Sequence, residues 1–155
     1  MGATEMVTVS EQSESEEKYA ELSLRLLRQA QEEFDKGDRL QASEKAWGAA
    51  AHAMKAAAER RGWNHSNHGL LFAVTNQIAG DTGHPELRTL FRDASSLHQN
   101  FYEDWQPDIS VQEGIDSVKQ LVEQMEELRA QPVRPSVVTD EQQWRRLTEP
   151  PRVRS

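Results

Sequence analysis

Histidine and arginine side chains gather in two short stretches of this sequence, and both types can act on phosphate esters. The first stretch holds Arg61, His65 and His68, and the second holds Arg92 and His98. An imidazole can remove the proton from a 2′-hydroxyl group, while a guanidinium can stabilise the charge that develops on the attacked phosphate. The pairs Arg61 with His68 and Arg92 with His98 therefore define one candidate chemistry, which is the metal-independent cleavage of RNA.

Helix geometry weighs against one of these pairs. Arg92 and His98 are six residues apart, and at about 100° per residue they would project about 120° apart around a continuous helix. Arg61 and His68 fall at a predicted helix end and in the loop that follows it, where the geometry is less constrained. The competing interpretation of Arg61 is a helix cap, in which a cation meets the negative end of the helix dipole.

A binding site without catalysis is the second interpretation of the same residues. If the helix around residue 45 packs against the helix around residue 98, their polar side chains meet inside a mainly apolar bundle, where bundles commonly hold ligands. The residues expected in this pocket are Glu44, Lys45, His65, His68, His98 and Asn100. The expected occupant is a nucleotide-type ligand or a partner protein. A Glu-Lys ion pair on a solvated helix face accounts for Glu44 and Lys45 equally well.

A zinc site is a third use of the histidines. His65 and His68 have the spacing of a ligand pair, and His98 with a carboxylate such as Glu103 would be needed to complete the coordination. Histidines in a polar loop are more often surface residues or helix caps, and the chain contains no cysteine that could supply a thiolate. We therefore expect no metal and no other cofactor.

Composition limits the class of protein. The 155 residues suit one domain, and 26 acidic against 18 basic residues give a net charge of −8. The segment after residue 130 holds five arginines and three acidic residues, which leaves −10 on the first 130 residues. This acidic body disfavours general nucleic-acid binding. No apolar run suggests a membrane span or a leader peptide, so a cytoplasmic protein is expected.

The elements that must position these side chains are helices. Apolar residues recur at intervals of three and four along five segments, and no segment alternates as a strand would. Ser13, Asp38 and Ser110 each precede Glu or Gln by three residues, which predicts three helix starts. Gly80 is expected to end the third helix, and Pro85 to open the fourth. The predicted helices cover about residues 14–35, 39–61, 70–79, 85–105 and 111–128.

The predicted organisation is an all-α, up-and-down bundle of about five helices. We expect a disordered segment over residues 1–13, the bundle over residues 14–131, and a flexible Pro/Arg-rich tail over residues 132–155. A short helix over residues 140–147 in that tail could lay Trp144 and Leu147 into a groove on this bundle or on a partner.

Three stretches of the sequence resemble the HEPN superfamily of small helical bundles. They are EEFDKGDRLQASEKAWGAAAHAMKAAAERRGW, the start His68-Gly69-Leu70-Leu71 of the third helix, and ASSLHQNFYEDW in the fourth helix. These stretches occur in the order that the family shows, and together they span most of residues 32–105.

The HEPN resemblance implies an up-and-down bundle that is often a symmetric dimer. Such bundles either partner a nucleotidyltransferase or act as metal-independent ribonucleases, which resemble one another in an Arg and a His four to six residues apart in the fourth helix. Arg92 and His98 have that position, whereas Arg61 and His68 depart from it. We expect a non-catalytic interaction module that forms a dimer. A ribonuclease is the first alternative, and a purely structural dimer is the second.

Overall fold

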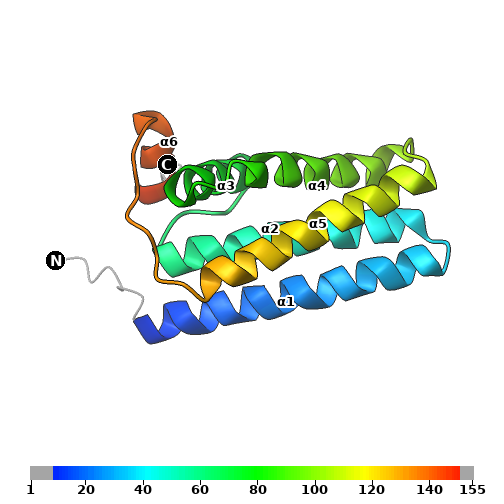
Figure 1. The fold of residues 1–155 in the computed structure, drawn as a ribbon, viewed down its shortest axis with the longest axis horizontal. Helices are drawn as coiled ribbons and strands as arrows, with labels where there is room; N and C mark the ends of the chain where they lie inside the picture. The colour runs from blue at the N-terminus through cyan, green and yellow to red at the C-terminus, as the bar shows by residue number, and fades with distance from the viewer. Residues whose placement is uncertain (1–8, 151–155) are drawn as a thin grey trace, which may run out of the picture.

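The computed structural model describes residues 9–150, which form six helices and no strand (Figure 1). The helices are α1 (Val9–Asp35), α2 (Arg39–Arg61), α3 (His68–Thr82), α4 (Glu86–Glu103), α5 (Asp108–Arg129) and α6 (Glu141–Thr148). The prediction of an all-α fold is confirmed, and the described residues form six helices where about five were expected. Of the disordered segment expected over residues 1–13, residues 1–8 lie outside the described residues, while residues 9–13 belong to α1. Within residues 9–150, no helix is both long and apolar enough to cross a membrane.

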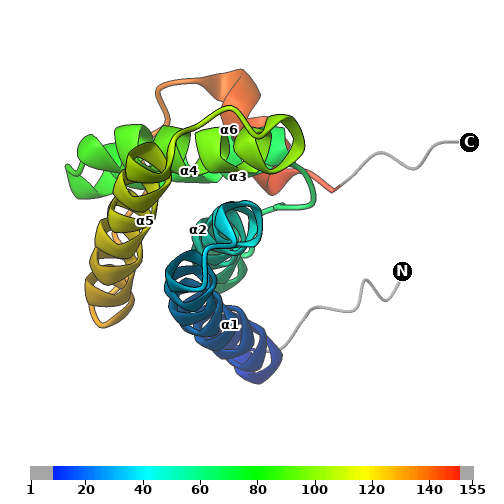
Figure 2. The ribbon, with the colours of Figure 1, turned by 90° about the vertical axis from the view of Figure 1, so that its right-hand side faces the viewer.

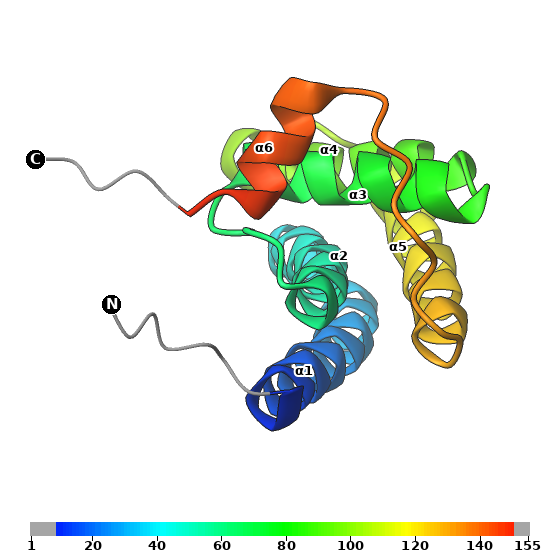
Figure 3. The ribbon, with the colours of Figure 1, turned by 90° about the vertical axis from the view of Figure 1, so that its left-hand side faces the viewer.

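Helix α2 forms the centre of the fold. It packs against α1, α3, α4 and α5, and Figures 2 and 3 show it between α1, α5 and the layer made by α3 and α4. All nine of its alanines are buried. Because a methyl group extends little from the helix axis, alanine lets neighbouring backbones approach closely. The composition of α2 therefore explains how one helix contacts four others.

The helix ends show which capping predictions were correct. Asp38 caps α2 as predicted, since its Oδ1 accepts a hydrogen bond from the backbone N–H of Gln41 at 3.0 Å. The starts predicted at Ser13 and Ser110 are wrong, because α1 already begins at Val9 and α5 begins at Asp108 after Pro107. In both cases the helical backbone continues upstream of the serine, which leaves no helix start for its side chain to cap.

The end of α3 also differs from the prediction. The helix continues through Gly80 to Thr82, and Gly83 ends it with a left-handed φ of 72°. A bond of 2.9 Å from Gln77 Nε2 to Asp81 Oδ1 links the two sides of Gly80 one turn apart. Gly80 is thus an interior glycine, and the left-handed conformation that favours glycine falls three residues later.

Helix α6 joins the C-terminal segment to the body of the protein. Leu147 is fully buried in the main core, and the Trp144 ring packs edge-on against Trp63 at 5.7 Å. Asn64 fixes this position, because its backbone N–H donates to the Leu147 carbonyl and its side chain donates to the carbonyls of Arg146 and Glu149. Trp144 and Leu147 therefore pack on this bundle, within the segment expected as a tail.

The contact between α4 and α5 depends on a missing side chain. A Cβ atom added at Gly114 would lie 2.7 Å from Cδ2 and 2.9 Å from Cγ of Leu97. Leu97 is only 1% exposed, so it has little room to move. Gly114 is accordingly required by packing, since its backbone is helical and needs no special conformation.

Replacing Gly114 with alanine should destabilise the fold by about 1–2 kcal/mol, because the overpacking cost exceeds the helix-propensity gain. Gly80→Ala is the matched control, since a Cβ there meets only the end of Arg88 at 3.8 Å. That control should gain about 0.5–1 kcal/mol. Urea unfolding of both variants measures the free energies. Equal stabilisation by the two alanines would contradict the assigned role of Gly114.

His52 brings a titratable group into the contact between α1 and α2. Its ring lies 5.8 Å from that of Tyr19, and its Nδ1–H donates to the Gly48 carbonyl at 2.7 Å. Burial lowers the pKa of His52, the bond to Gly48 opposes this effect, and the charge of Lys55 adds to the lowering. The folded protein therefore binds a proton at His52 less readily than the unfolded chain does.

This lowered pKa predicts a loss of stability in mild acid. Below about pH 6.5 the unfolded chain takes up a proton at His52 before the folded protein does, so the contribution is present above that pH and is lost as the pH falls. The fall in unfolding free energy between pH 7.5 and pH 5 should be smaller in His52→Gln than in the wild type. Exposed His84 provides the control. A His52→Gln profile parallel to the wild type would refute the assignment.

Candidate functional site

Three aromatic side chains from three helices stack against one another at the junction of α2, α3 and α4. The His68 ring lies parallel to the Trp47 indole, at 4.9 Å between centroids and 7° between planes. His98 is 5.0 Å from His68 and 5.3 Å from Trp47, and Tyr102 meets His98 edge-on at 5.3 Å. We call Trp47, His68, His98 and Tyr102 the ring cluster.

The side chains of the ring cluster range from buried to exposed. Trp47 is buried at 6% and joins the core, His98 is partly buried, and His68 and Tyr102 are exposed, Tyr102 to 72%. Glu44 orients His98 through a 2.9 Å contact between its Oε2 and the imidazole Nδ1. The cluster therefore presents an oriented imidazole and two exposed rings above a fixed indole.

Local sequence spacing explains how each helix supplies its part. Glu44 and Trp47 are three residues apart on α2, and His98 and Tyr102 are four apart on α4, so each pair shares one helix face. His68 is the first residue of α3, whose start is capped by the Asn67 side chain at the Leu70 N–H. Of the residues expected in the pocket, the structure brings Glu44 to His98 and His68 to His98.

Lys45 and His65 do not join the ring cluster. Lys45 turns to α1, where its Nζ lies 3.3 Å from Glu33 Oε1. His65 also faces α1, with its ring 5.6 Å from Tyr19 and its Nε2 3.6 Å from Glu59. Lys45 lies on the α1 side of α2 because it is one helical position, about 100°, from Glu44, whereas His65 lies in the loop between α2 and α3. The pocket expected from the sequence is therefore corrected to exclude them.

Asn100 also has a different role from the one expected. It is fully buried, and its Nδ2 donates to Ser43 Oγ at 3.0 Å. Its Oδ1 accepts from the backbone N–H groups of Trp105 and Gln106. These bonds hold the turn between α4 and α5, including Asp104 at a left-handed φ of 46°. Asn100 is therefore a structural residue rather than a ligand-binding one.

Neither candidate catalytic pair is brought together within the chain. Arg61 bonds the Ala57 carbonyl at 3.0 Å and lies over the Trp63 ring. His68 stacks on Trp47, which precedes Ala57 by ten residues on α2, or about 15 Å along the helix axis.

Arg92 and His98 likewise have separate surroundings. Arg92 Nη2 donates to Thr89 Oγ1 at 3.3 Å, and the side chain lines a hollow between α3, α4 and α6. His98 faces Glu44 and the ring cluster instead. This arrangement agrees with the divergence expected from six helical residues.

The histidines do not gather as metal ligands would. Across the part of the chain that the structure describes, no three His, Cys, Asp or Glu side chains are arranged to hold a metal ion. His65 and His68 in particular face different helices, since one contacts Tyr19 and the other Trp47.

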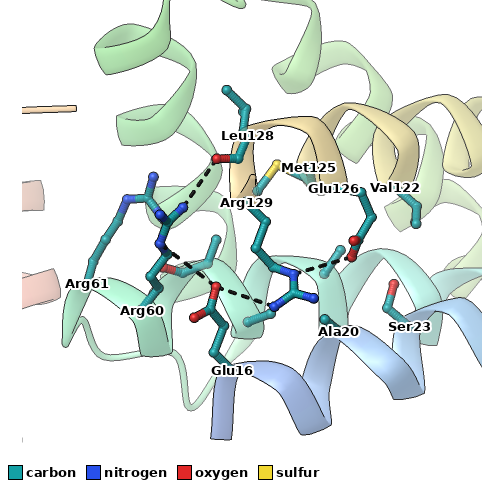
Figure 4. Close-up of a pocket in the computed structure, with 13 residues that line it drawn as sticks. Glu16, Ala20, Ser23, Arg60, Arg61, Val122, Met125, Glu126, Leu128 and Arg129 are labelled. Carbon is teal, nitrogen blue, oxygen red and sulfur yellow. Dashed lines mark hydrogen bonds and ion pairs between the residues drawn. The ribbon is translucent and has the colours of Figure 1, made fainter. Parts of the chain in front are cut away.

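Figure 4 shows a second polar group, in a small pocket between α1, α2 and α5. Glu16 lies 3.9 Å from both Arg60 Nε and Arg129 Nη1, while Arg60 also donates to the carbonyls of Leu128 and Gln131. The cavity measures about 20 Å³, which is the room of one or two water molecules. We call Glu16, Arg60 and Arg129 the arginine clamp. The cavity beside these residues is too small for a ligand, so they are best explained as a structural ion pair.

Arg61 borders this pocket as well. Burial lowers the pKa of Arg61, with a smaller contribution from the charge of Arg60, but an arginine remains protonated at neutral pH. The sequence contains no signal for the arginine clamp, because its members come from three helices that are remote along the chain. Arg61 is the cation of one candidate catalytic pair in the sequence. In the structure it lies at the end of α2 and packs on the Trp63 ring.

Removing the charge of Glu16 should leave two guanidinium groups without their shared partner. Glu16→Gln is expected to lower the unfolding free energy by about 1–2 kcal/mol, between the values of exposed and buried pairs. Glu17→Gln removes the same charge from an exposed position on α1 and should change stability by less than about 0.5 kcal/mol. Chemical denaturation compares the two, and similar losses would argue against the clamp.

Comparison with known proteins identifies a family and leaves the activity open. A family model described as the archaeal PaREP1/PaREP8 family matches residues 18–122. That range includes the whole ring cluster and ends before α6. No curated protein and no solved structure matches the chain, and the HEPN resemblance stays a prediction. Since the family model covers more than half of its length, the chain belongs to the archaeal PaREP1/PaREP8 family.

Proposed function

We propose that this chain is a HEPN-like, non-catalytic binding module of the cytoplasm, and that its ring cluster binds the base of a nucleotide. One observation carries the proposal, which is the stack of Trp47, His68 and His98 that ends at the exposed rings of His68 and Tyr102. Aromatic side chains hold bases by stacking, at about 1–3 kcal/mol per base. An exposed ring backed by a fixed one is suited to this contact.

Glu44 adds a means of recognising the polar edge of a base. Its Oε2 contacts His98, and its Oε1 has no hydrogen-bond partner among the described residues. A carboxylate oxygen beside stacked rings can accept a hydrogen bond from an exocyclic amino group. His68 is exposed, and an imidazole N–H can donate a hydrogen bond to a phosphate oxygen.

The separate positions of both candidate catalytic arginines favour binding over catalysis in this proposal. Arg61 and Arg92 are both engaged away from the ring cluster, whereas phosphoryl transfer to a 2′-hydroxyl needs a cation at the phosphorane. A base-binding site with an oriented imidazole, from which both candidate catalytic arginines turn away, is consistent with a module that senses or presents a nucleotide.

The proposed assembly is a homodimer that partners a nucleotidyltransferase. Tyr102, Trp105 and Ile109 are exposed to 72%, 56% and 64% at the corner between α4 and α5. Tyrosine and tryptophan are over-represented at the energetic centres of protein interfaces. This corner adjoins the ring cluster through Tyr102, so a subunit seated there would enclose the bound base.

Calorimetric titration with the common ribonucleotides tests the proposal. At least one nucleotide should bind the wild type, and His68→Ala and Tyr102→Ala should each weaken it about tenfold, as loss of a stacking contact implies. The matched control is His84→Ala, which removes an exposed imidazole that contacts only Glu86. Sedimentation of the same sample reports the oligomeric state. The proposal fails if no nucleotide binds, or if His84→Ala is as harmful as His68→Ala.

A further inference from the structure

A second hollow, on the other side of α3, has a different chemical character. It lies between α3, α4 and α6 with a volume of about 400 Å³, which is within the range of small-molecule sites. Arg88, Arg92 and Arg146 line it, and its lining contains no acidic side chain. We call this hollow the arginine groove.

The three guanidinium groups of the arginine groove have no carboxylate partner among residues 9–150. Arg88 bonds to the side chain and carbonyl of Asn76, and Arg92 bonds only to Thr89 Oγ1. The side chain of Arg146 makes no hydrogen bond or ion pair with any described residue.

Among the other arginines of the described chain, four have a carboxylate partner, while Arg25, Arg28, Arg61 and Arg134 form no ion pair with a described carboxylate and do not line this hollow. Arg39, Arg60, Arg129 and Arg145 each lie within 4.0 Å of a carboxylate. Carboxylates outnumber cations in this protein, with 26 acidic and 18 basic residues. Three arginines gathered without one therefore form a local concentration of unbalanced positive charge.

The structure holds two of these arginines in defined positions. Gln143 of α6 bonds to Asn76 of α3 at 2.9 Å, and Asn76 in turn accepts from Arg88 at 2.6 Å. Gly69 makes room for Arg146, since a Cβ added there would lie 2.8 Å from Arg146 Nη2. The groove is thus assembled by α6 docking on α3, with a glycine where the guanidinium approaches.

We propose that the arginine groove binds the phosphoryl groups of a small phosphorylated ligand. The planar fork of arginine matches phosphate oxygens in bidentate geometry, and three such forks suit the charge of a diphosphate. An extended nucleic acid fits less well, because the surrounding chain carries a net charge of −8.

Phe72 gives the ligand a second contact. Its ring is 37% exposed in the lining of the groove and is backed edge-on by Phe91 at 4.9 Å. The groove therefore offers an apolar surface beside the three cations. This site goes beyond the ring cluster, since Arg146 belongs to α6 and lies outside the residues that the family model matches.

Titration with inorganic pyrophosphate at low salt tests this proposal on the full chain. Pyrophosphate should bind the wild type, and Arg92→Gln and Arg146→Gln should each weaken binding at least about tenfold, as loss of a charge-assisted hydrogen bond implies. Arg25→Gln is the matched control, because Arg25 is exposed on α1 and its substitution removes the same charge. It should bind pyrophosphate as the wild type does.

A second variant separates position from charge. Gly69→Ala keeps every arginine but places a methyl group where the end of Arg146 lies, so pyrophosphate affinity should fall while the melting temperature does not. Mixed single-stranded RNA supplies a further arm. Equal weakening by Arg25→Gln, absence of pyrophosphate binding, or binding of the RNA alone would each overturn the proposal.

Discussion

The close approach of helices to α2 is the constraint on which the rest of this structure depends. Alanine fills the surface of α2, and even Gly48 has Leu26 of α1 at 3.1 Å from where its Cβ would lie. Each alanine buries little apolar area, so the stability of this helix comes from the sum of many short contacts. Trp47 is the large ring among these small residues, and the imidazoles of α3 and α4 reach α2 where it lies.

The helical core could be predicted from the sequence because it follows from local periodicity. Asp38 marked the start of α2, since its side chain bonds a backbone group only three residues away. Ser13 and Ser110 carry the same local pattern, yet their helices begin earlier at residues that include exposed ones, so a capping pattern alone does not fix a helix start. The helix end predicted at Gly80 is wrong for a related reason, because the helix continues to Thr82 and ends at the left-handed residue Gly83.

The candidate sites were predictable only as far as a helix face can be inferred. Glu44 and His98 were expected to meet, because each lies on the side of its helix that the apolar stripe turns inward. Lys45 lies one residue from Glu44 and points to α1, a distinction that depends on which helix covers which side. The arginine groove was not foreseen, since it exists only when residues near 90 and near 146 are placed together. Net charge averaged over the chain conceals such a local excess.

The docking of α6 has a consequence for how this protein can be divided. Leu147 fills a site in the main core. Asn64, in the loop before α3, donates its side-chain N–H groups to the carbonyls of Arg146 and Glu149. A fragment that ended at residue 131 would expose to water the core surface that Leu147 covers, and Trp63 would lose its edge-on contact with Trp144. The packed core of this polypeptide thus extends beyond the family-matched region, and truncation boundaries for expression belong after Glu149.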